Sequence, residues 1–181
     1  VDNISWKTLQ KKLKKDDAAV EIIRFNYFNN GWTDTVLYVA LVLTQETREH
    51  PDIVLLKNGK EIEQQFIKYK SVIEEKSTDN SSYNTFWADI EEIIKNKKNI
   101  YISADGIYNL ININTMKIPG EGYLIEKHNF FFLTNTLDLA NYSQSQNNGK
   151  NGKNGNNKEA VLIGYPRFYL SQLKKSTDEN E

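Results

Sequence analysis

The chain has no cysteine among its 181 residues and has only two histidines. Without a thiol it cannot form a disulfide, a cysteine-ligated zinc site or the thiolate nucleophile of a cysteine peptidase. The histidines, His50 and His128, stand alone in the sequence, so their spacing indicates no metal site. The absence of cysteine fits a reducing compartment, and we expect a cytoplasmic protein.

A surplus of charge is also missing. Lys plus Arg number 23 and Asp plus Glu number 24, which gives a formal net charge of −1 at pH 7. No strong field therefore steers the chain to nucleic acid or anionic lipid. Surface solvation and helix-end charge explain the lysine clusters at 11–15, 95–98 and 150–158, so we expect no direct contact with nucleic acid.

Long hydrophobic runs are absent as well. The longest run, Val36–Leu43, is too short to cross a bilayer, and we expect no membrane partner. No charged and then apolar leader is present, and the first residue is Val1 rather than Met. We therefore expect that the chain was cut from something longer.

The residues that are present suffice for one domain with a sizeable core. Strand and helix patterns alternate in a way that predicts an α/β fold. An apolar strand, Ile100–Ser103, stops at Asp105-Gly106 and follows a helical stripe. That stripe consists of Tyr83, Phe86, Trp87, Ile90, Ile93 and Ile94.

Further elements are expected before and after that unit. In chain order they are a helix over Trp6–Leu13, strands over Ala18–Phe28, Thr35–Thr44 and Ile53–Leu56 with a hairpin turn at 29–31, a helix capped by Asn58, an antiparallel strand pair over Tyr123–Ile125 and Asn129–Thr134, and a short helix that Thr136 caps and that runs through Tyr142.

The order and spacing of these motifs resemble the CHAT family, caspase-like domains found with tetratricopeptide repeats. The segments that carry the resemblance are Trp6–Leu13 with Asp17–Tyr27, Thr35–Thr44, Ile100–Asn112 with its Asp-Gly corner, Gly122–Glu126, Phe130–Thr136 and Ala160–Phe168 with its Gly-x-Pro strand end. The resemblance implies a caspase-like three-layer sandwich, with a mixed, mainly parallel sheet flanked by helices.

Members of that family cleave peptides with a His–Cys dyad, which lies beyond the Gly-x-Pro segment. Because this chain has no cysteine, it looks like the amino-terminal, non-catalytic pseudo-caspase half. The resemblance implies three partners: the catalytic half of the same domain, a tetratricopeptide-type repeat or other sensor, and a protein substrate of the parent. We expect no catalytic residue, cofactor or metal in this chain alone.

The same interpretation divides the chain into three parts. Residues 1–142 would form the pseudo-caspase-like lobe, and 143–158 a low-complexity flexible loop without apolar side chains. Residues 159–181 would hold the first strand of the following lobe and a polar tail. An exposed apolar patch for that lobe is expected near Tyr165, Phe168, Tyr169 and Leu170.

Several residues allow a sharper interpretation, and each has a simpler rival. His128, in an expected tight turn, is interpreted as structural or solvent-exposed because no nucleophile pairs with it. Asp105 ends a strand where a nucleophile or a Mg²⁺ ligand is often found. An Asp-Gly turn that caps its own backbone is preferred for it. Ser103 ends the same strand without the glycines of a nucleophile elbow.

Asp89, Glu91 and Glu92 lie off the apolar stripe of their helix, so we expect a solvated face with a Glu91–Lys95 pair. Gly149, Gly152 and Gly155 stand in the low-complexity stretch rather than at a strand-to-helix junction, so they are not a phosphate-binding loop.

Two alternatives to the supporting lobe stay open. The parent could be an interaction scaffold that has lost the dyad, or the chain could be a free-standing α/β enzyme that uses Asp105. The sequence also leaves open whether the chain is truncated or naturally processed.

Overall fold

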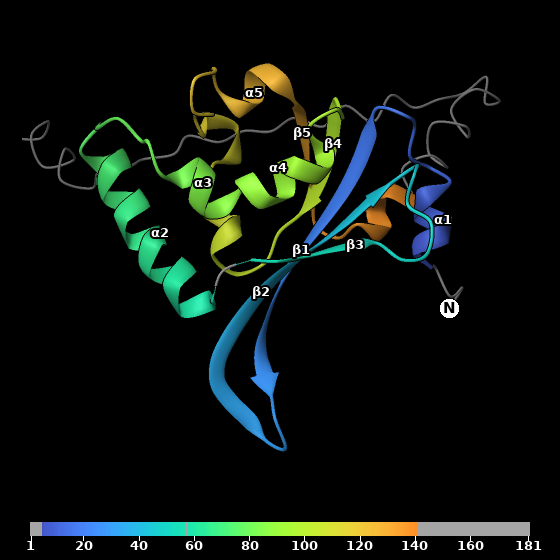
Figure 1. The fold of residues 1–181 in the computed structure, drawn as a ribbon, viewed down its shortest axis with the longest axis horizontal. Helices are drawn as coiled ribbons and strands as arrows, with labels where there is room; N and C mark the ends of the chain where they lie inside the picture. Colours follow the sequence, from blue (N-terminus) through green and yellow to red (C-terminus); the bar gives the residue numbers. More distant parts are fainter. Residues whose placement is uncertain (1–4, 57, 141–181) are drawn as a thin grey trace, which may run out of the picture.

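A five-stranded mixed sheet lies at the centre of the computed structural model, which describes residues 5–56 and 58–140 (Figure 1). The strands are β1 (Asp17–Phe28), β2 (Trp32–Thr44), β3 (Asp52–Leu55), β4 (Asn99–Ser103) and β5 (Asn129–Leu133). Their order across the sheet is β3-β2-β1-β4-β5. β1, β4 and β5 pair in parallel, whereas β2 pairs antiparallel with both of its neighbours. The predicted α/β class is confirmed.

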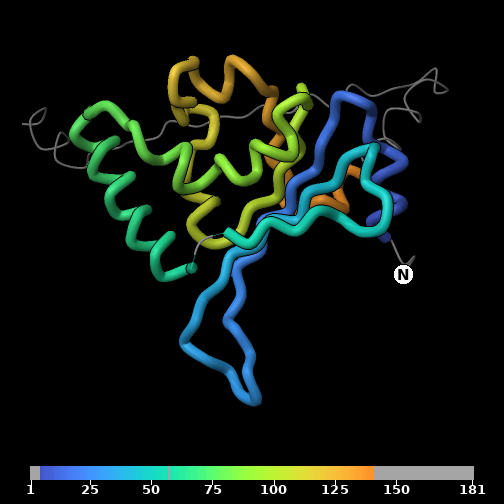
Figure 2. The backbone as a smooth tube through the Cα atoms, in the orientation of Figure 1, coloured from blue at the N-terminus to red at the C-terminus, as the bar shows by residue number. Residues whose placement is uncertain are grey.

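The β1–β2 hairpin is much longer than the rest of the sheet. Its register runs from Ala18–Thr44 to Phe28–Trp32, whereas β4 pairs with β1 only as far as Glu21. The residues beyond, 25–35, therefore project from the body as a two-stranded arm, which Figures 1 and 2 show clearly. Asn30 takes a positive φ of 54° at the predicted turn.

One face of the sheet packs against helices. These are α2 (Gly59–Glu74), α3 (Ser82–Phe86) and α4 (Ala88–Ile94) (Figure 1). The predicted cap is confirmed, because Asn58 accepts a hydrogen bond from the backbone N–H of Lys60 at 2.9 Å. The core between helices and sheet includes Val20, Ile22, Tyr38, Ala40, Ile62, Trp87, Ile90, Ile100 and Ile102.

The expected stripe from Tyr83 to Ile94 is buried or half-buried as predicted, but it does not lie on one continuous helix. Trp87, with φ −132° and ψ −29°, separates α3 from α4. The break divides the stripe between two short helices, although the apolar residues on both sides of it face the core.

Fewer helical residues pack on the opposite face of the sheet. Helix α1 (Trp6–Gln10) and the helical residues 137–140 pack there in a small cluster with Leu13, Ala19 and Leu43. Beyond that cluster is an apolar surface, called here the open face. It consists of Ile23, Val39, Leu41, Ile53 and Leu55. Among the described residues, the second helical layer of the expected sandwich is therefore only partial.

The region after β4 corrects two predictions. Tyr123–Ile125 is not a strand paired with Asn129–Thr134: residues Leu124–Lys127 form a short helix, α5, and β5 pairs in parallel with β4 instead. Asn135, rather than Thr136, caps the residues 137–140, because its side chain accepts a hydrogen bond from the N–H of Leu137 at 2.8 Å.

Two short 3-10 helices, η1 (Gly106–Asn109) and η2 (Ile113–Thr115), lie between β4 and α5. They bring Tyr108, Ile111 and Ile113 into the core, although this stretch has no clear hydrophobic period. The predicted loop 143–158, the segment 159–181 and the patch at Tyr165, Phe168, Tyr169 and Leu170 lie outside the described residues.

Candidate functional site

His128 is buried between α4 and the start of β5 and is not in a solvent-exposed turn. Its side chain has 0% exposure. Nδ1 lies 2.7 Å from the carbonyl oxygen of Lys97, and Nε2 lies 3.0 Å from both carboxylate oxygens of Glu91. Of the two alternatives kept open for this residue, the structural role is confirmed and the exposed one is wrong.

These contacts engage both nitrogens of the ring. The carbonyl oxygen of Lys97 and the carboxylate of Glu91 are hydrogen-bond acceptors, so each ring nitrogen has an acceptor oxygen as its partner. A general base needs a nitrogen that can reach a proton of the substrate, and neither nitrogen of this buried ring is free to do so.

Glu91 is the centre of the network around His128. Its carboxylate also accepts from the indole Nε1 of Trp87 at 3.0 Å and from Nζ of Lys127 at 2.9 Å. Burial raises the pKa of the Glu91 carboxyl, but the hydrogen bonds from His128 and Lys127 outweigh it and hold that pKa below its ordinary value. The hydrogen bond between Lys127 and Glu91 in turn raises the pKa of Lys127.

The expectation of a solvated acidic face is wrong for Glu91 and confirmed for Asp89 and Glu92, which are exposed. Instead of pairing with Lys95, Glu91 pairs with Lys127 and His128. The sequence contained a signal for this, since Glu91 follows Trp87 by four residues and so shares its face of the helix.

Asp105 forms the backbone-capping turn that the sequence favours. One carboxylate oxygen accepts from the N–H of Gly106 at 2.7 Å, and the other accepts from the N–H of Arg24 at 3.1 Å. Gly106 has a positive φ of 56°, and a Cβ there would collide with Tyr38 and Arg24. The corner thus ties the carboxyl end of β4 to the middle of β1.

A second network surrounds that corner. Glu63 on α2 accepts from Nε of Arg24 at 2.9 Å and from the hydroxyl of Tyr38 at 3.3 Å, and that hydroxyl in turn accepts from the N–H of Ile107 at 3.3 Å. The hydrogen bond to Glu63 raises the pKa of the Arg24 guanidinium, and burial raises the pKa of Tyr38. The polar side chains of this second network are therefore hydrogen-bonded to one another.

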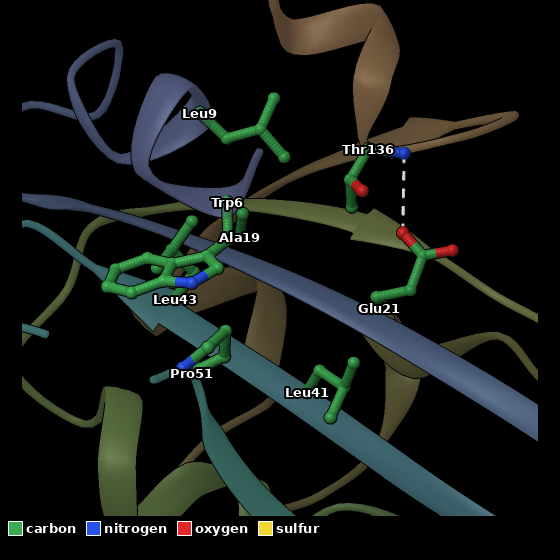
Figure 3. A pocket seen from close by; sticks show the side chains of 8 residues that line it. All are labelled: Trp6, Leu9, Ala19, Glu21, Leu41, Leu43, Pro51 and Thr136. Carbon is green, nitrogen blue, oxygen red and sulfur yellow. Dashed lines mark hydrogen bonds between the residues drawn. The ribbon is translucent and has the colours of Figure 1, made fainter. Parts of the chain in front are cut away.

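Ser103 lies on the sheet face opposite to His128. Its hydroxyl donates to Glu21 at 3.1 Å, and Glu21 also accepts from the N–H of Thr136 at 3.3 Å (Figure 3). Ser103 lies opposite Leu133, five residues from His128, so the two are separated along the strand by roughly 17 Å. They cannot exchange a proton.

Glu21 borders a small pocket of about 120 Å³ on this face. Figure 3 shows its lining, which is mainly apolar: Trp6, Leu9, Ala19, Leu41, Leu43 and Pro51, with Glu21 and Thr136 at one side. The pocket is too small for most substrates, since drug-sized ligands occupy about 300–1,000 Å³. It is a gap between α1 and the sheet.

His50 is an exposed loop residue whose Nδ1 lies 2.8 Å from the carbonyl oxygen of Pro51. Across residues 5–56 and 58–140, no three His, Cys, Asp or Glu side chains gather as metal ligands would. In the same residues no helix has the length and apolarity that a membrane crossing needs.

The arm exposes three aromatic side chains, including the most exposed large apolar residue among those described, Trp32. Trp32 is 78% exposed, Phe28 is 58% exposed and Tyr27 is 46% exposed. Phe28 and Trp32 pack edge to face, with ring centroids 5.3 Å apart at the tip. Grouped exposed aromatics of this kind are typical of protein contact surfaces.

Comparison of the chain with models of protein families, with curated proteins and with solved structures found no match. The CHAT resemblance therefore stays a prediction from the sequence.

Proposed function

We propose that this chain is the amino-terminal, non-catalytic lobe of a caspase-like cysteine peptidase of the CHAT type. In the parent it supports a lobe that carries the His–Cys dyad, and it links that lobe to a tetratricopeptide-type repeat or another sensor. The sheet order, with three parallel strands and an antiparallel hairpin at one side, is compatible with the pseudo-caspase half of such a domain.

The observation that carries the proposal is the aromatic arm. Burying Trp32 and Phe28 against another domain would be favourable by about 1.5–3 kcal/mol for each side chain that becomes fully buried. A domain that acted alone would gain nothing from such an exposed tip. We assign residues 25–35 as the contact with the catalytic lobe.

The interior chemistry supports a supporting role rather than a catalytic one. His128 has both nitrogens engaged, Ser103 has no imidazole beside it, and Asp105 caps a backbone turn. Each of the polar groups considered as a catalyst has a structural partner. The scaffold alternative shares this chemistry and differs only in whether the parent keeps its dyad.

The test uses the parent protein, extended past residue 181. We expect its downstream sequence to hold a histidine and then a cysteine, each at the end of an apolar strand, and the extended protein to react with a thiol-directed peptidase probe. A parent with no such pair would overturn the peptidase proposal and leave the alternative of an interaction scaffold.

The role of the arm has its own test in that parent. Replacing Phe28 and Trp32 with Ser should lower peptidase activity at least 10-fold while the cysteine stays reactive to a small thiol reagent. The matched control is Ile67→Ser on α2, which removes a side chain that is 64% exposed and should leave activity unchanged. Equal activity in both variants would contradict the assignment of the arm.

A further inference from the structure

The open face is an apolar surface of the sheet that no described element covers. Ile53 and Leu55 on β3 are 64% and 65% exposed, and Ile23 on β1 is 36% exposed. Cross-strand pairing joins them into one surface, because Leu55 lies opposite Val39, Val39 opposite Ile23, and Ile53 opposite Leu41.

Strand β3 is apolar on both sides. Val54 and Leu56 point into the core under α2, while Ile53 and Leu55 alternate with them onto the open face. A strand that is apolar on both faces is typical of a sheet covered on both faces. Its sequence therefore indicates that something lies over Ile53 and Leu55.

The described chain ends at the border of this surface. Leu139 and Ala140 pack with Leu9 and Leu43, and Thr136 lines the pocket beside Leu41. The next residues of the chain therefore start next to the open face and not on the far side of the molecule.

The sequence after Ala140 contains one segment suited to this surface. Residues 143–158 have no apolar side chain, and the run Ala160–Leu170 then brings Val161, Leu162 and Ile163, followed by aromatic residues at 165, 168 and 169. We propose that residues 160–170 of this same chain lie on the open face and form the missing part of the second covering layer.

The connection is long enough. The chain between Ala140 and Ala160 has nineteen residues, and a random coil of that length has a root-mean-square span of roughly 25 Å. Leu55 is two residues and one strand from Leu41, or roughly 8 Å, so every part of the open face is within reach.

Tethering also favours this occupant over a second copy of the chain. A short flexible connection gives a local concentration in the millimolar range, far above that of a protein in solution at micromolar concentration. The inference does not depend on the proposed peptidase parent, because it concerns two parts of this chain.

The absence of cysteine makes a direct test possible in the full chain. Ile53→Cys and Ile67→Cys, made separately, place single thiols at positions with the same 64% exposure, one on the open face and one on α2. If residues 160–170 cover the open face, a maleimide should label Cys at 53 at least 10-fold more slowly than Cys at 67, at every protein concentration.

A third variant identifies what protects the face. Replacing Val161, Leu162 and Ile163 with Ser in the Ile53→Cys chain should restore rapid labelling. Equal rates at 53 and 67 in the unaltered background would overturn the proposal. Protection that appears only at high protein concentration would also overturn it, and would indicate that a second copy of the chain covers the face. Protection that survives the triple replacement would overturn it as well.

Cross-linking gives an independent measurement. Ile53→Cys is combined in turn with Leu162→Cys, Tyr165→Cys and Phe168→Cys. Ile67→Cys is combined with the same three substitutions. Mild oxidation should form an intramolecular disulfide at least 10-fold faster in one of the Ile53 pairs than in its Ile67 counterpart. No preference at any of the three positions would overturn the inference.

Discussion

Nε2 of His128 lies 3.0 Å from each carboxylate oxygen of Glu91, and this contact joins α4 to the residue that precedes β5. The other ring nitrogen bonds the carbonyl of Lys97 in the turn that leads to β4. One imidazole ring thus connects a helix, a turn and the start of a strand. Removing the Glu91 carboxylate leaves the buried ring of His128 and Nζ of Lys127 without the partner they share, and breaking a buried pair in this way costs more than the pair itself contributes.

Glu91→Gln is therefore expected to destabilise the fold by about 3–5 kcal/mol, measured by urea unfolding at pH 7. The matched control is Glu92→Gln, which changes an exposed neighbour on the same helix and should alter the free energy of unfolding by less than about 0.5 kcal/mol. Equal stability of the two variants would show that the buried network contributes nothing.

The same carboxylate should make stability depend on acid pH. The folded protein holds the pKa of Glu91 below its ordinary value, because the hydrogen bonds from His128 and Lys127 outweigh the effect of burial. Its contribution is present above the unfolded pKa, about 4.3, and is lost as pH falls through the lower folded value. We expect the unfolding free energy to fall more steeply below pH about 4.3 in the unaltered protein than in Glu91→Gln; parallel curves would contradict this.

The sequence predicted the elements whose signals are local. The hairpin turn at 29–31, the Asn58 cap and the apolar strand Ile100–Ser103 all follow from residues adjacent in the chain, and the structure confirms each. Asp105 belongs with them, because an Asp-Gly turn bonds within its own backbone.

Predictions that depended on distant partners were less accurate. Periodicity indicated a single helix from Tyr83 to Ile94, but the helix breaks at Trp87, which is buried in the core. The burial of Glu91 likewise involves His128, which lies 37 positions later in the chain. The strand partner of Asn129–Leu133 was wrong for a related reason. A nearby apolar segment suggested a hairpin, whereas β5 pairs with β4, which is thirty positions earlier in the chain.

Gly106→Ala tests the corner at the end of β4. The new methyl group meets two penalties, a positive φ of 56° and a collision with Tyr38 and Arg24. Gly120→Ala is the matched control, since φ is 76° there but no atom lies within 4 Å of the added Cβ. We expect Gly106→Ala to lower the free energy of unfolding by about 1–3 kcal/mol more than Gly120→Ala does. Thermal unfolding should show this as a lower melting temperature. An equal loss in both would mean that only backbone strain matters.

The arm can be tested by fluorescence, because the three tryptophans differ in exposure. Trp87 is 1% exposed, Trp6 is partly buried and Trp32 at the tip is 78% exposed. Trp32→Phe should therefore remove the most red-shifted and most readily acrylamide-quenched part of the emission. It should change the free energy of unfolding by less than about 1 kcal/mol, since the edge-to-face contact with Phe28 is the aromatic interaction it alters.

Trp6→Phe is the control and should leave the red-shifted component in place. A blue-shifted component lost with Trp32 would mean that the tip is covered in solution, and the arm would then not be a free contact surface.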